Sequence, residues 1–237
     1  MKIHYLLCGL PRSYINTIKY INNLFNEYSI IYYIIDDHTQ GEQFAIDKLD
    51  IEYRRCLFNI QEFKHHIDIK YGKGYKYNNI DIQFYKVYKL FNQIVEYGEG
   101  DIVIRGRTDM LPFFNNSGLK NKELPEKGWK KTDDDELVYD NGININRYNL
   151  KDYLYYIGLD YKKHPYHYMY DGWFMSDYKK IKILVECGIQ YDNRFMDKSM
   201  KWKDGKPPEA QLLMNLLKKD VKLDTVSDIS SCVRCIK

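Results

Sequence analysis

The first third of the chain alternates between continuous apolar runs and a segment of helical periodicity. Residues 2–9 form an apolar run typical of a buried strand. Apolar residues then recur at helical spacing at Tyr14, Ile18, Ile21 and Phe25. Residues 28–35 form a second apolar run, which Asp36 and Asp37 end. Because a strand, a helix and a strand at this spacing form a βαβ unit, we predict a right-handed crossover between two parallel strands.

The same alternation continues toward the middle of the chain. Residues 51–60 predict a third strand, whereas residues 64–79 show no clear period and predict a loop. One helical face is then formed by Phe84, Val87, Tyr88, Phe91, Ile94 and Val95. Gly98 and Gly100 end this helix before a strand that begins near residue 101. A helix that leads into a strand adds a further α/β layer.

The second half of the chain is more polar, and its elements are less regular. Residues 112–150 predict a solvated excursion with a short strand at 137–139. A helix is expected over residues 179–187, where Gly188 stops it. The last helix begins at Pro207 and is expected to turn one face inward, formed by Ala210, Leu213, Met214 and Leu217.

The succession of these elements predicts the fold class. Strands that alternate with helices favour an α/β fold with a central, mostly parallel sheet flanked by helices. A chain of 237 residues fits one large domain. We find no internal repeat, and no segment rich in glycine, serine or proline divides the chain. We therefore expect a single domain over residues 1–237.

Composition argues against several classes of protein. Lysine and arginine number 36 against 33 acidic residues, a formal charge of +3, so the balance does not indicate nucleic-acid binding. No apolar segment approaches the roughly 20 residues that cross a bilayer, and no secretion signal is apparent. Five cysteines in such a chain favour reduced thiols, with Cys8 and Cys187 in the core. We expect a cytoplasmic protein, with peripheral attachment to a membrane as an alternative.

Residues 101–110 combine an apolar strand with charge. The β-branched start of this segment suits the middle of a sheet, whereas Arg105, Arg107 and Asp109 need partners or solvent. We therefore expect the strand to surface at these charges. Guanidinium groups bind phosphate oxygens and a carboxylate binds a hard divalent cation, so the segment predicts a site for a metal and a phosphate. A purely structural cluster of Arg–Asp ion pairs is the alternative.

Further charged residues are expected at the same edge of the sheet, because the carboxyl ends of parallel strands meet there. The set comprises Arg12, Asp36, Asp37, Arg105, Arg107, Asp109 and Asp171. It offers cations for a diphosphate, a carboxylate for a divalent ion, and a carboxylate among aromatic residues. A nucleotide-sugar site needs these three groups. A metal and arginines stabilise the leaving nucleoside diphosphate, while a desolvated carboxylate accepts the hydroxyl proton of the acceptor.

Short motifs follow one another along most of the chain. They are Gly-Leu-Pro-Arg-Ser at 9–13, the helical segment 83–90, Asp-Ile-Val-Ile-Arg-Gly-Arg-Thr-Asp at 101–109, Tyr-Asp-Gly-Trp-Phe at 170–174, Pro-Glu-Ala-Gln at 208–211 and Val-Arg at 233–234. Their order and spacing resemble the GT-A glycosyltransferases, specifically bacterial and viral members with Arg-x-Asp in place of Asp-x-Asp. The resemblance implies a GT-A-like (Rossmann-like) domain, in which residues 1–110 bind the nucleotide and residues 111–237 bind the acceptor.

The resemblance also implies roles for the residues of the nucleotide half. Asp109 would bind a Mn²⁺ or Mg²⁺ ion held by the diphosphate of the nucleotide sugar. Arg107 stands where the usual motif has its first aspartate, so that one protein carboxylate replaces two, and Arg105 is expected beside it at the diphosphate. Arg12 would contact the phosphate, and Asp36 or Asp37 the nucleoside.

Two acidic residues are candidates for the acceptor side. The resemblance implies that Asp171 acts as the base of an inverting reaction or orients the acceptor, and Glu209 is a second candidate. The structural alternatives are that Asp171 caps a turn at Gly172 and that Glu209 complements a helix dipole.

The leading hypothesis is a glycosyltransferase that moves a sugar from a nucleotide-sugar donor to a hydroxyl of a glycan or glycoconjugate acceptor. A second hypothesis is a noncatalytic protein that binds a nucleotide sugar or a glycan through a degenerate GT-A site. A third, binding of nucleic acid through tyrosines and lysines, is disfavoured by the even mix of charges.

Overall fold

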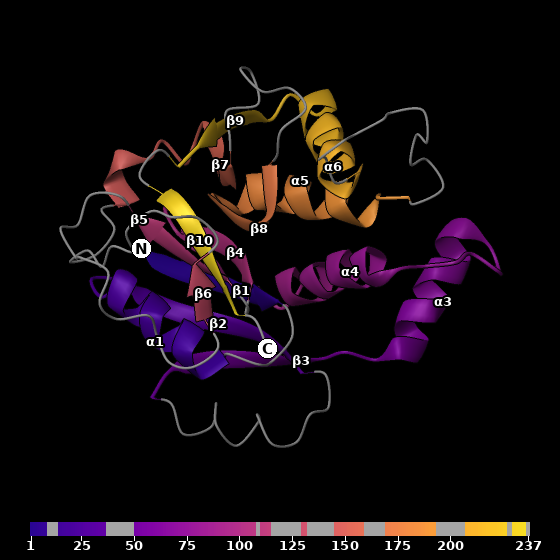
Figure 1. Ribbon diagram of the computed structural model, residues 1–237, viewed down its shortest axis with the longest axis horizontal. Coiled ribbons are helices and arrows are strands. Elements are labelled where there is room, and N and C mark those ends of the chain that lie inside the picture. Colours follow the sequence, from indigo (N-terminus) through magenta and orange to yellow (C-terminus); the bar gives the residue numbers. More distant parts are fainter. Residues whose placement is uncertain are drawn as a thin grey trace.

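The computed structural model describes residues 1–8, 14–36, 50–107, 110–114, 129–131, 145–158, 169–192, 207–226 and 229–235. Most of the described strands belong to one large sheet: β1 (Lys2–Cys8), β2 (Ser29–Asp36), β3 (Glu52–Leu57), β4 (Ile102–Arg107), β7 (Tyr153–Gly158), β8 (Met169–Ser176) and β9 (Lys222–Thr225). A small second sheet contains β5 (Met110–Phe114), β6 (Trp129–Lys131) and β10 (Ile229–Cys235). The helices are α1 (Tyr14–Leu24), α3 (Ile60–Tyr71), α4 (Asn79–Phe91), α5 (Tyr178–Ile189), α6 (Pro207–Lys218) and the short 3₁₀ helix η2 (Ile145–Arg147). Figure 1 shows their arrangement.

The large sheet has the strand order β3-β2-β1-β4-β8-β7-β9. Its first four strands in this order are parallel to one another, and β7 is parallel to β9. Strand β8 is antiparallel to both of its neighbours, β4 and β7. The sheet is therefore mostly parallel and the fold class α/β, as the sequence predicts. The parallel pairing of β1 with β2 across α1 confirms the predicted βαβ unit.

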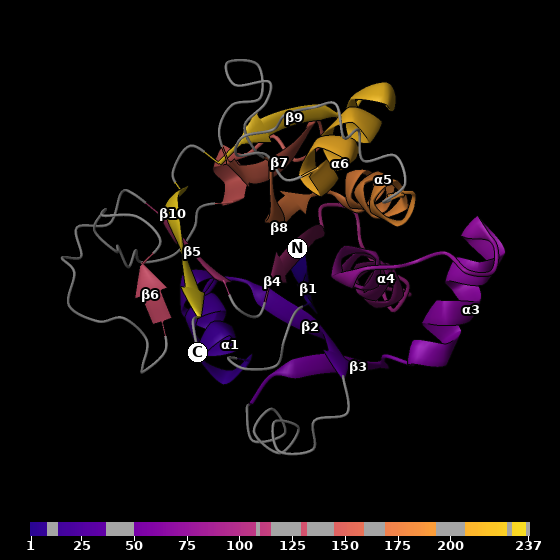
Figure 2. The ribbon, with the colours of Figure 1, turned by 45° about the vertical axis from the view of Figure 1, so that its right-hand side comes forward.

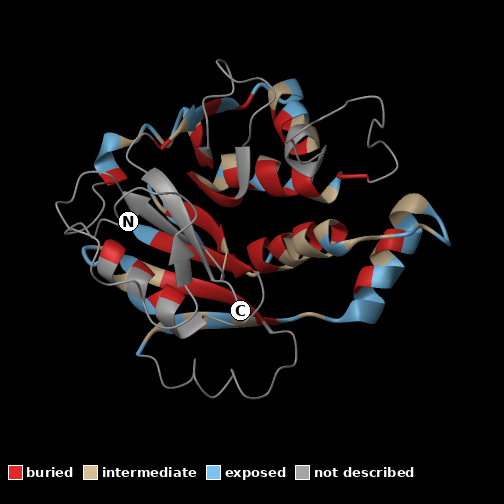
Figure 3. Cartoon of the chain, viewed as in Figure 1, coloured by how far each residue is buried: buried red, intermediate tan, exposed pale blue. Residues whose placement is uncertain are grey.

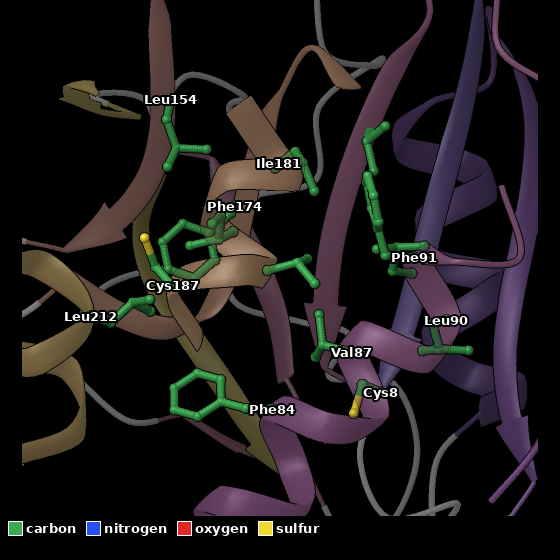
Figure 4. Packing of buried hydrophobic residues seen from close by; sticks show 14 of the residues in the cluster. Cys8, Phe84, Val87, Leu90, Phe91, Leu154, Phe174, Ile181, Cys187 and Leu212 are labelled. Atoms are coloured by element: carbon green, nitrogen blue, oxygen red, sulfur yellow. The ribbon is translucent and has the colours of Figure 1, made fainter. Parts of the chain in front are cut away.

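Helices cover both faces of this sheet (Figure 2). On one face, α1 contributes Ile18 and Ile21 to a core with Tyr5 and Ile104. On the other face, which we call the α4 face, the helices α4, α5 and α6 pack on alternate residues of the same strands. These residues include Leu6, Cys8, Val103, Leu154 and Phe174, and Figure 4 labels Cys8, Leu154 and Phe174 among them. Because side chains alternate along a strand, the near-continuous apolar runs of β1, β2 and β4 are buried on both faces (Figure 3).

The loop that the sequence predicts over residues 64–79 is wrong for residues 64–71, which belong to helix α3, while residues 72–78 have neither helix nor strand. Asn59 caps the helix by accepting hydrogen bonds from the backbone N–H groups of Gln61 and Glu62. Phe63 and Ile67, one turn apart, are buried against Tyr85 of α4. The helix was missed because only two positions of its surface are fully buried, which leaves a weak periodicity among charged residues.

The residues of α6 that are buried differ in part from the predicted ones. Leu213 is buried as predicted, but Met214 is 55 % exposed, while Leu212 and Leu216 are buried. Val95 is 81 % exposed because α4 ends before it, at Phe91. The buried side chains of Cys8 and Cys187 confirm their predicted place in the core. The strand predicted at 137–139 lies outside the described residues.

Gly106 fits its place in β4 because a tyrosine ring occupies the space beside it. A Cβ atom added at Gly106 would lie 2.6 Å from Cε1 of Tyr5, closer than real Cβ atoms approach a ring. Tyr5 is itself buried in the α1-side core and packs beside Tyr32, with ring centres 5.8 Å apart. The glycine between Arg105 and Arg107 is therefore required by packing.

We predict that Gly106→Ala lowers the free energy of unfolding by about 1–3 kcal/mol, the usual cost of overpacking a core. Urea denaturation followed by circular dichroism measures this loss. The same substitution in a Tyr5→Leu background should cost much less, because the ring that it meets is gone. Equal costs in the two backgrounds would contradict the packing explanation.

Candidate functional site

The parallel strands β1 to β4 end along one side of the sheet, which we call the carboxyl edge. Strand β1 lies between β2 and β4, and α1 after β1 covers one face while α4 before β4 covers the other. The connection that follows β1 and the connection that precedes β4 therefore lie on opposite faces of the sheet. Such a topological switch point leaves a crevice beyond the strand ends, and ligands of open α/β sheets bind there.

Arg107 lies at this switch point. It is the last residue of β4 and pairs with Cys8, the last residue of β1. Its side chain is partly exposed, in contrast to the fully buried residues that precede it in the strand. The thiol of Cys8 lies 3.9 Å from the backbone carbonyl oxygen of Gln83, so the start of α4 borders the switch point. A guanidinium at this position can reach an anion beyond the strand end.

Arg105 does not surface where the sequence analysis expects it to. It is only 2 % exposed and lies in the strand interior, paired with Leu6 on one side and Phe174 on the other. Its guanidinium carbon lies 5.6 Å from the centre of the Phe174 ring, within the range of a cation–π contact. The strand therefore emerges two positions later than expected, at Arg107, because the hydrogen-bonded pairing with β8 extends over Arg105.

Other residues proposed from the sequence are placed through their backbone alone. Asp36 is the last residue of β2, at the carboxyl edge. Asp171 lies near the start of β8, which comes to the same edge because β8 is antiparallel. Glu209 lies in the first turn of α6, whose far end leads into β9 on the opposite edge. The topology therefore brings these three backbone positions to the same edge of the sheet as Arg107. Arg12, Asp37 and Asp109 lie outside the described residues.

A divalent metal ion needs oxygen ligands that converge on one point. Within the part of the chain that the structure describes, no group of three or more His, Cys, Asp or Glu side chains is arranged to hold one. The carboxylate that the sequence favours for a metal belongs to Asp109, which lies outside the described residues. The metal site thus stays a prediction from the sequence.

The structure adds a polar cluster that the sequence analysis missed, where α3, α4 and the end of α5 meet. The ammonium group of Lys70 donates hydrogen bonds to the hydroxyl of Tyr71 and to the carbonyl oxygen of Ile189. The Tyr71 hydroxyl donates to the carbonyl oxygen of Tyr191. Asp192, the next residue, is buried and exchanges backbone hydrogen bonds with the side chain of Gln211 at distances of 3.2 and 3.3 Å.

Asp81 completes this cluster from the first turn of α4. Its carboxylate accepts hydrogen bonds from the backbone N–H of Asn78 at 2.8 Å and from the hydroxyl of Tyr75 at 3.3 Å. The first bond belongs to a capping box, so Asp81 fixes the start of the helix. Residues including His66, Tyr71, Asp81 and Tyr191 line a cavity of about 10 Å³, room for roughly one water molecule.

Burial dominates the electrostatics of the cluster. It lowers the pKa of Lys70 from 10.5 to about 8, although the charges of Asp192 and Asp81 act in the opposite direction. Burial also raises the pKa of the Asp81 carboxyl and lowers that of His66. The cluster therefore joins α3 to the end of α5 through groups whose charged forms are disfavoured by burial. It lies at the carboxyl-edge ends of these helices.

Only a weak sequence signal marks these residues. Asn78 and Asp81 have the spacing of a capping box, but this signal falls at the end of the predicted loop, outside any predicted helix. Lys70 and Tyr71 meet Ile189 and Tyr191 across more than a hundred residues. No local pattern encodes a contact of that kind.

Comparisons with known proteins leave the family open. No protein-family model matches the sequence, and no curated protein does either. A solved structure of the galactosyltransferase LgtC with donor and acceptor sugar analogs is similar at a TM-score of 0.48 and 17 % identity, over 94 % of this chain and 73 % of that one. The 4-diphosphocytidyl-2C-methyl-D-erythritol synthase of Anaerococcus prevotii gives a TM-score of 0.36 and 11 % identity, over 97 % of this chain and 89 % of that one. At these scores neither likeness carries an argument about function.

None of the described helices combines the length and the apolar character that crossing a membrane requires.

The depressed pKa of Lys70 predicts a dependence of stability on pH. Between about pH 8 and pH 10.5 the unfolded chain holds a proton on this lysine that the folded protein has lost, so this group makes the free energy of unfolding rise with pH. Lys70→Met removes this contribution. The free energy of unfolding of the wild type minus that of Lys70→Met should therefore increase with pH, by less than about 1.4 kcal/mol per pH unit.

Urea denaturation at several pH values between about 7.5 and 10 measures this difference. Lys182→Met, which removes an exposed lysine of α5, is the matched control and should show a constant difference from wild type. A constant difference for Lys70→Met as well would contradict the burial of its charge.

Proposed function

We propose that the protein is a glycosyltransferase that moves a sugar from a nucleotide-sugar donor to a hydroxyl of a glycan or glycoconjugate. The observation that supports this most is the position of Arg107, partly exposed at the topological switch point beside the end of β1. A nucleoside diphosphate is an anion of the size and charge that such a crevice binds.

The nucleotide half of the proposed site lies at the ends of the parallel strands. Arg107 contacts the diphosphate, and Asp109, two positions further on, holds a Mn²⁺ or Mg²⁺ ion bound to the same phosphates. Arg12, in the segment after β1, contributes a second cation, and Asp36 or Asp37 after β2 contacts the nucleoside. The positive charges and the metal stabilise the negative charge that develops on the departing diphosphate.

The acceptor half lies across β8. Asp171 is near the start of β8, the strand that pairs with β4, and in this proposal it lies near the sugar that the diphosphate carries. A carboxylate there accepts the proton of the acceptor hydroxyl or orients the acceptor. Glu209, in the first turn of α6, is the second candidate for this role. The GT-A resemblance of the motifs around 101–109 and 170–174 supports the same assignment.

One feature of the motif favours a second candidate function, noncatalytic binding of a nucleotide sugar or a glycan. Arg107 takes the position at which the Asp-x-Asp motif has a carboxylate, so one ligand of the metal is replaced by a cation. Weaker binding of the metal would preserve recognition of the diphosphate while reducing transfer.

The test is binding and turnover with UDP-, GDP- and dTDP-sugars in the presence of Mn²⁺. We expect one of these donors to bind by calorimetry and to be transferred or hydrolysed. Arg107→Met should weaken donor binding roughly 10- to 100-fold, the cost of a lost charged hydrogen bond. Asp109→Ala should lower turnover by at least a similar factor and abolish its dependence on added Mn²⁺.

Asp224→Asn is the matched control, because it removes an exposed carboxylate on β9, at the far end of the sheet. It should leave donor binding and turnover unchanged. Binding without turnover would support the noncatalytic alternative. If no donor binds, and Arg107→Met and Asp109→Ala behave as wild type, the proposed function is wrong.

A further inference from the structure

Arg105 is a cation placed where a sheet normally holds an apolar side chain. It is 2 % exposed, and the α4 face around it is formed by residues such as Leu6, Cys8 and Phe174. Taking a charge out of water costs several kcal/mol, and apolar replacements of buried ionic groups are often as stable or more stable. A structural need for packing therefore does not explain an arginine at this position.

The position of Arg105 along β4 also places it farther than Arg107 from the strand end where the proposed diphosphate binds. Arg107 is two positions nearer to the end of β4 and is the partly exposed one of the pair. Residues two apart in a strand project from the same face, with about 7 Å between them. Arg105 thus lies on the α4 face one step deeper in the sheet than Arg107, and it is buried where Arg107 is partly exposed.

The contacts of Arg105 lie across the junction between the two halves of the sheet. Strands β3, β2, β1 and β4 come from the first half of the chain, and β8, β7 and β9 from the second. The junction between them is the antiparallel pairing of β4 with β8, whose register extends over Val103–Ser176, Ile104–Met175 and Arg105–Phe174. The guanidinium of Arg105 lies over the ring of Phe174, its partner in the last of these pairs.

This pairing sets where the acceptor half begins. The pairing ends at Arg105 and Phe174, two residues before Arg107 in β4 and three residues after Asp171 in β8. A shift of β8 against β4 would therefore move Asp171 relative to Arg107 by the same distance. In a transfer reaction a misplacement of about 1 Å can cost about 100-fold in rate.

We propose that Arg105 is a positioning residue, which holds β8 against β4 through its contact with Phe174 and so sets the position of Asp171 relative to Arg107. This inference rests on the proposed function for its kinetic consequences, while its structural consequence is independent of any substrate. It replaces the direct contact with the diphosphate that the sequence analysis assigns to Arg105.

The experiment compares Arg105→Met and Arg105→Lys with Arg107→Met. Arg54→Met is the matched control, because Arg54 is an exposed arginine of β3 in the same cross-strand row, through Tyr33 and Leu6. Hydrogen exchange of the backbone amides of residues 103–105 and 174–176 reports the pairing of β4 with β8. Donor binding by calorimetry and steady-state kinetics then separate affinity from turnover.

We expect Arg105→Met to speed exchange at these amides at least about tenfold, because the pairing opens more often, while the β1–β2 amides stay protected. With an active donor, kcat should fall about 100-fold and donor affinity should change less than about threefold. Arg105→Lys, which keeps the charge and loses the planar group, should show smaller changes of the same kind and serves if Arg105→Met does not fold. Arg54→Met should match wild type in every measurement.

Two results would overturn the inference. Unchanged exchange in both Arg105 variants would show that the residue does not hold β8, whether or not any nucleotide sugar is a substrate. A loss of donor affinity as large as that of Arg107→Met would assign Arg105 to the diphosphate. Failure of all donors to bind wild type, with exchange altered as expected, would reject the proposed function and leave the structural role of Arg105 supported.

Discussion

The parallel pairing of β1 with β4 is the constraint on which the rest of the structure depends. It places side by side a strand that α1 follows on one face of the sheet and a strand that α4 precedes on the other face. Both layers of the core follow from it, because alternate residues of β1 and β4 meet different helices. It also makes the ends of β1 and β4 a topological switch point, where Arg107 lies beside Cys8 and where ligands of open α/β sheets bind. The proposed anion site and the buried core therefore depend on the same topology.

Polar groups buried near this edge oppose stability rather than support it. Lys70 donates a hydrogen bond from α3 to the end of α5, and burial there lowers the pKa of its ammonium group. Arg105 is a cation within an apolar layer, beside Phe174. Such groups are retained where geometry matters more than the free energy of folding. Their position on the carboxyl-edge side agrees with a site whose parts come from separate segments of the chain.

The sequence predicts elements with a strong apolar run or a clear period better than elements whose burial depends on distant contacts. Strands β1, β2 and β4 and the helix α4 carry strong local signals, either apolar runs or a clear period. Helix α3 was missed because only Phe63 and Ile67 of its surface are fully buried. The predicted buried face of α6 differs from the observed one because a run of leucines fits more than one helical phase. The pairing of β8 with β4 and β7 depends on contacts far apart in the sequence, which no local pattern contains.

The sequence predicts at which edge of the sheet the candidate residues lie better than it predicts how deeply each is buried. Charged residues that follow an apolar strand are expected at the carboxyl edge, and Arg107 lies there. The burial of Arg105 depends on β8, so residues 101–110 alone could not reveal it. The most direct test of the account is a crystal structure with a bound nucleoside diphosphate. The account predicts the diphosphate beyond the ends of β1 and β4, in contact with Arg107; a diphosphate bound elsewhere, with Arg107 engaged only by protein groups, would contradict it.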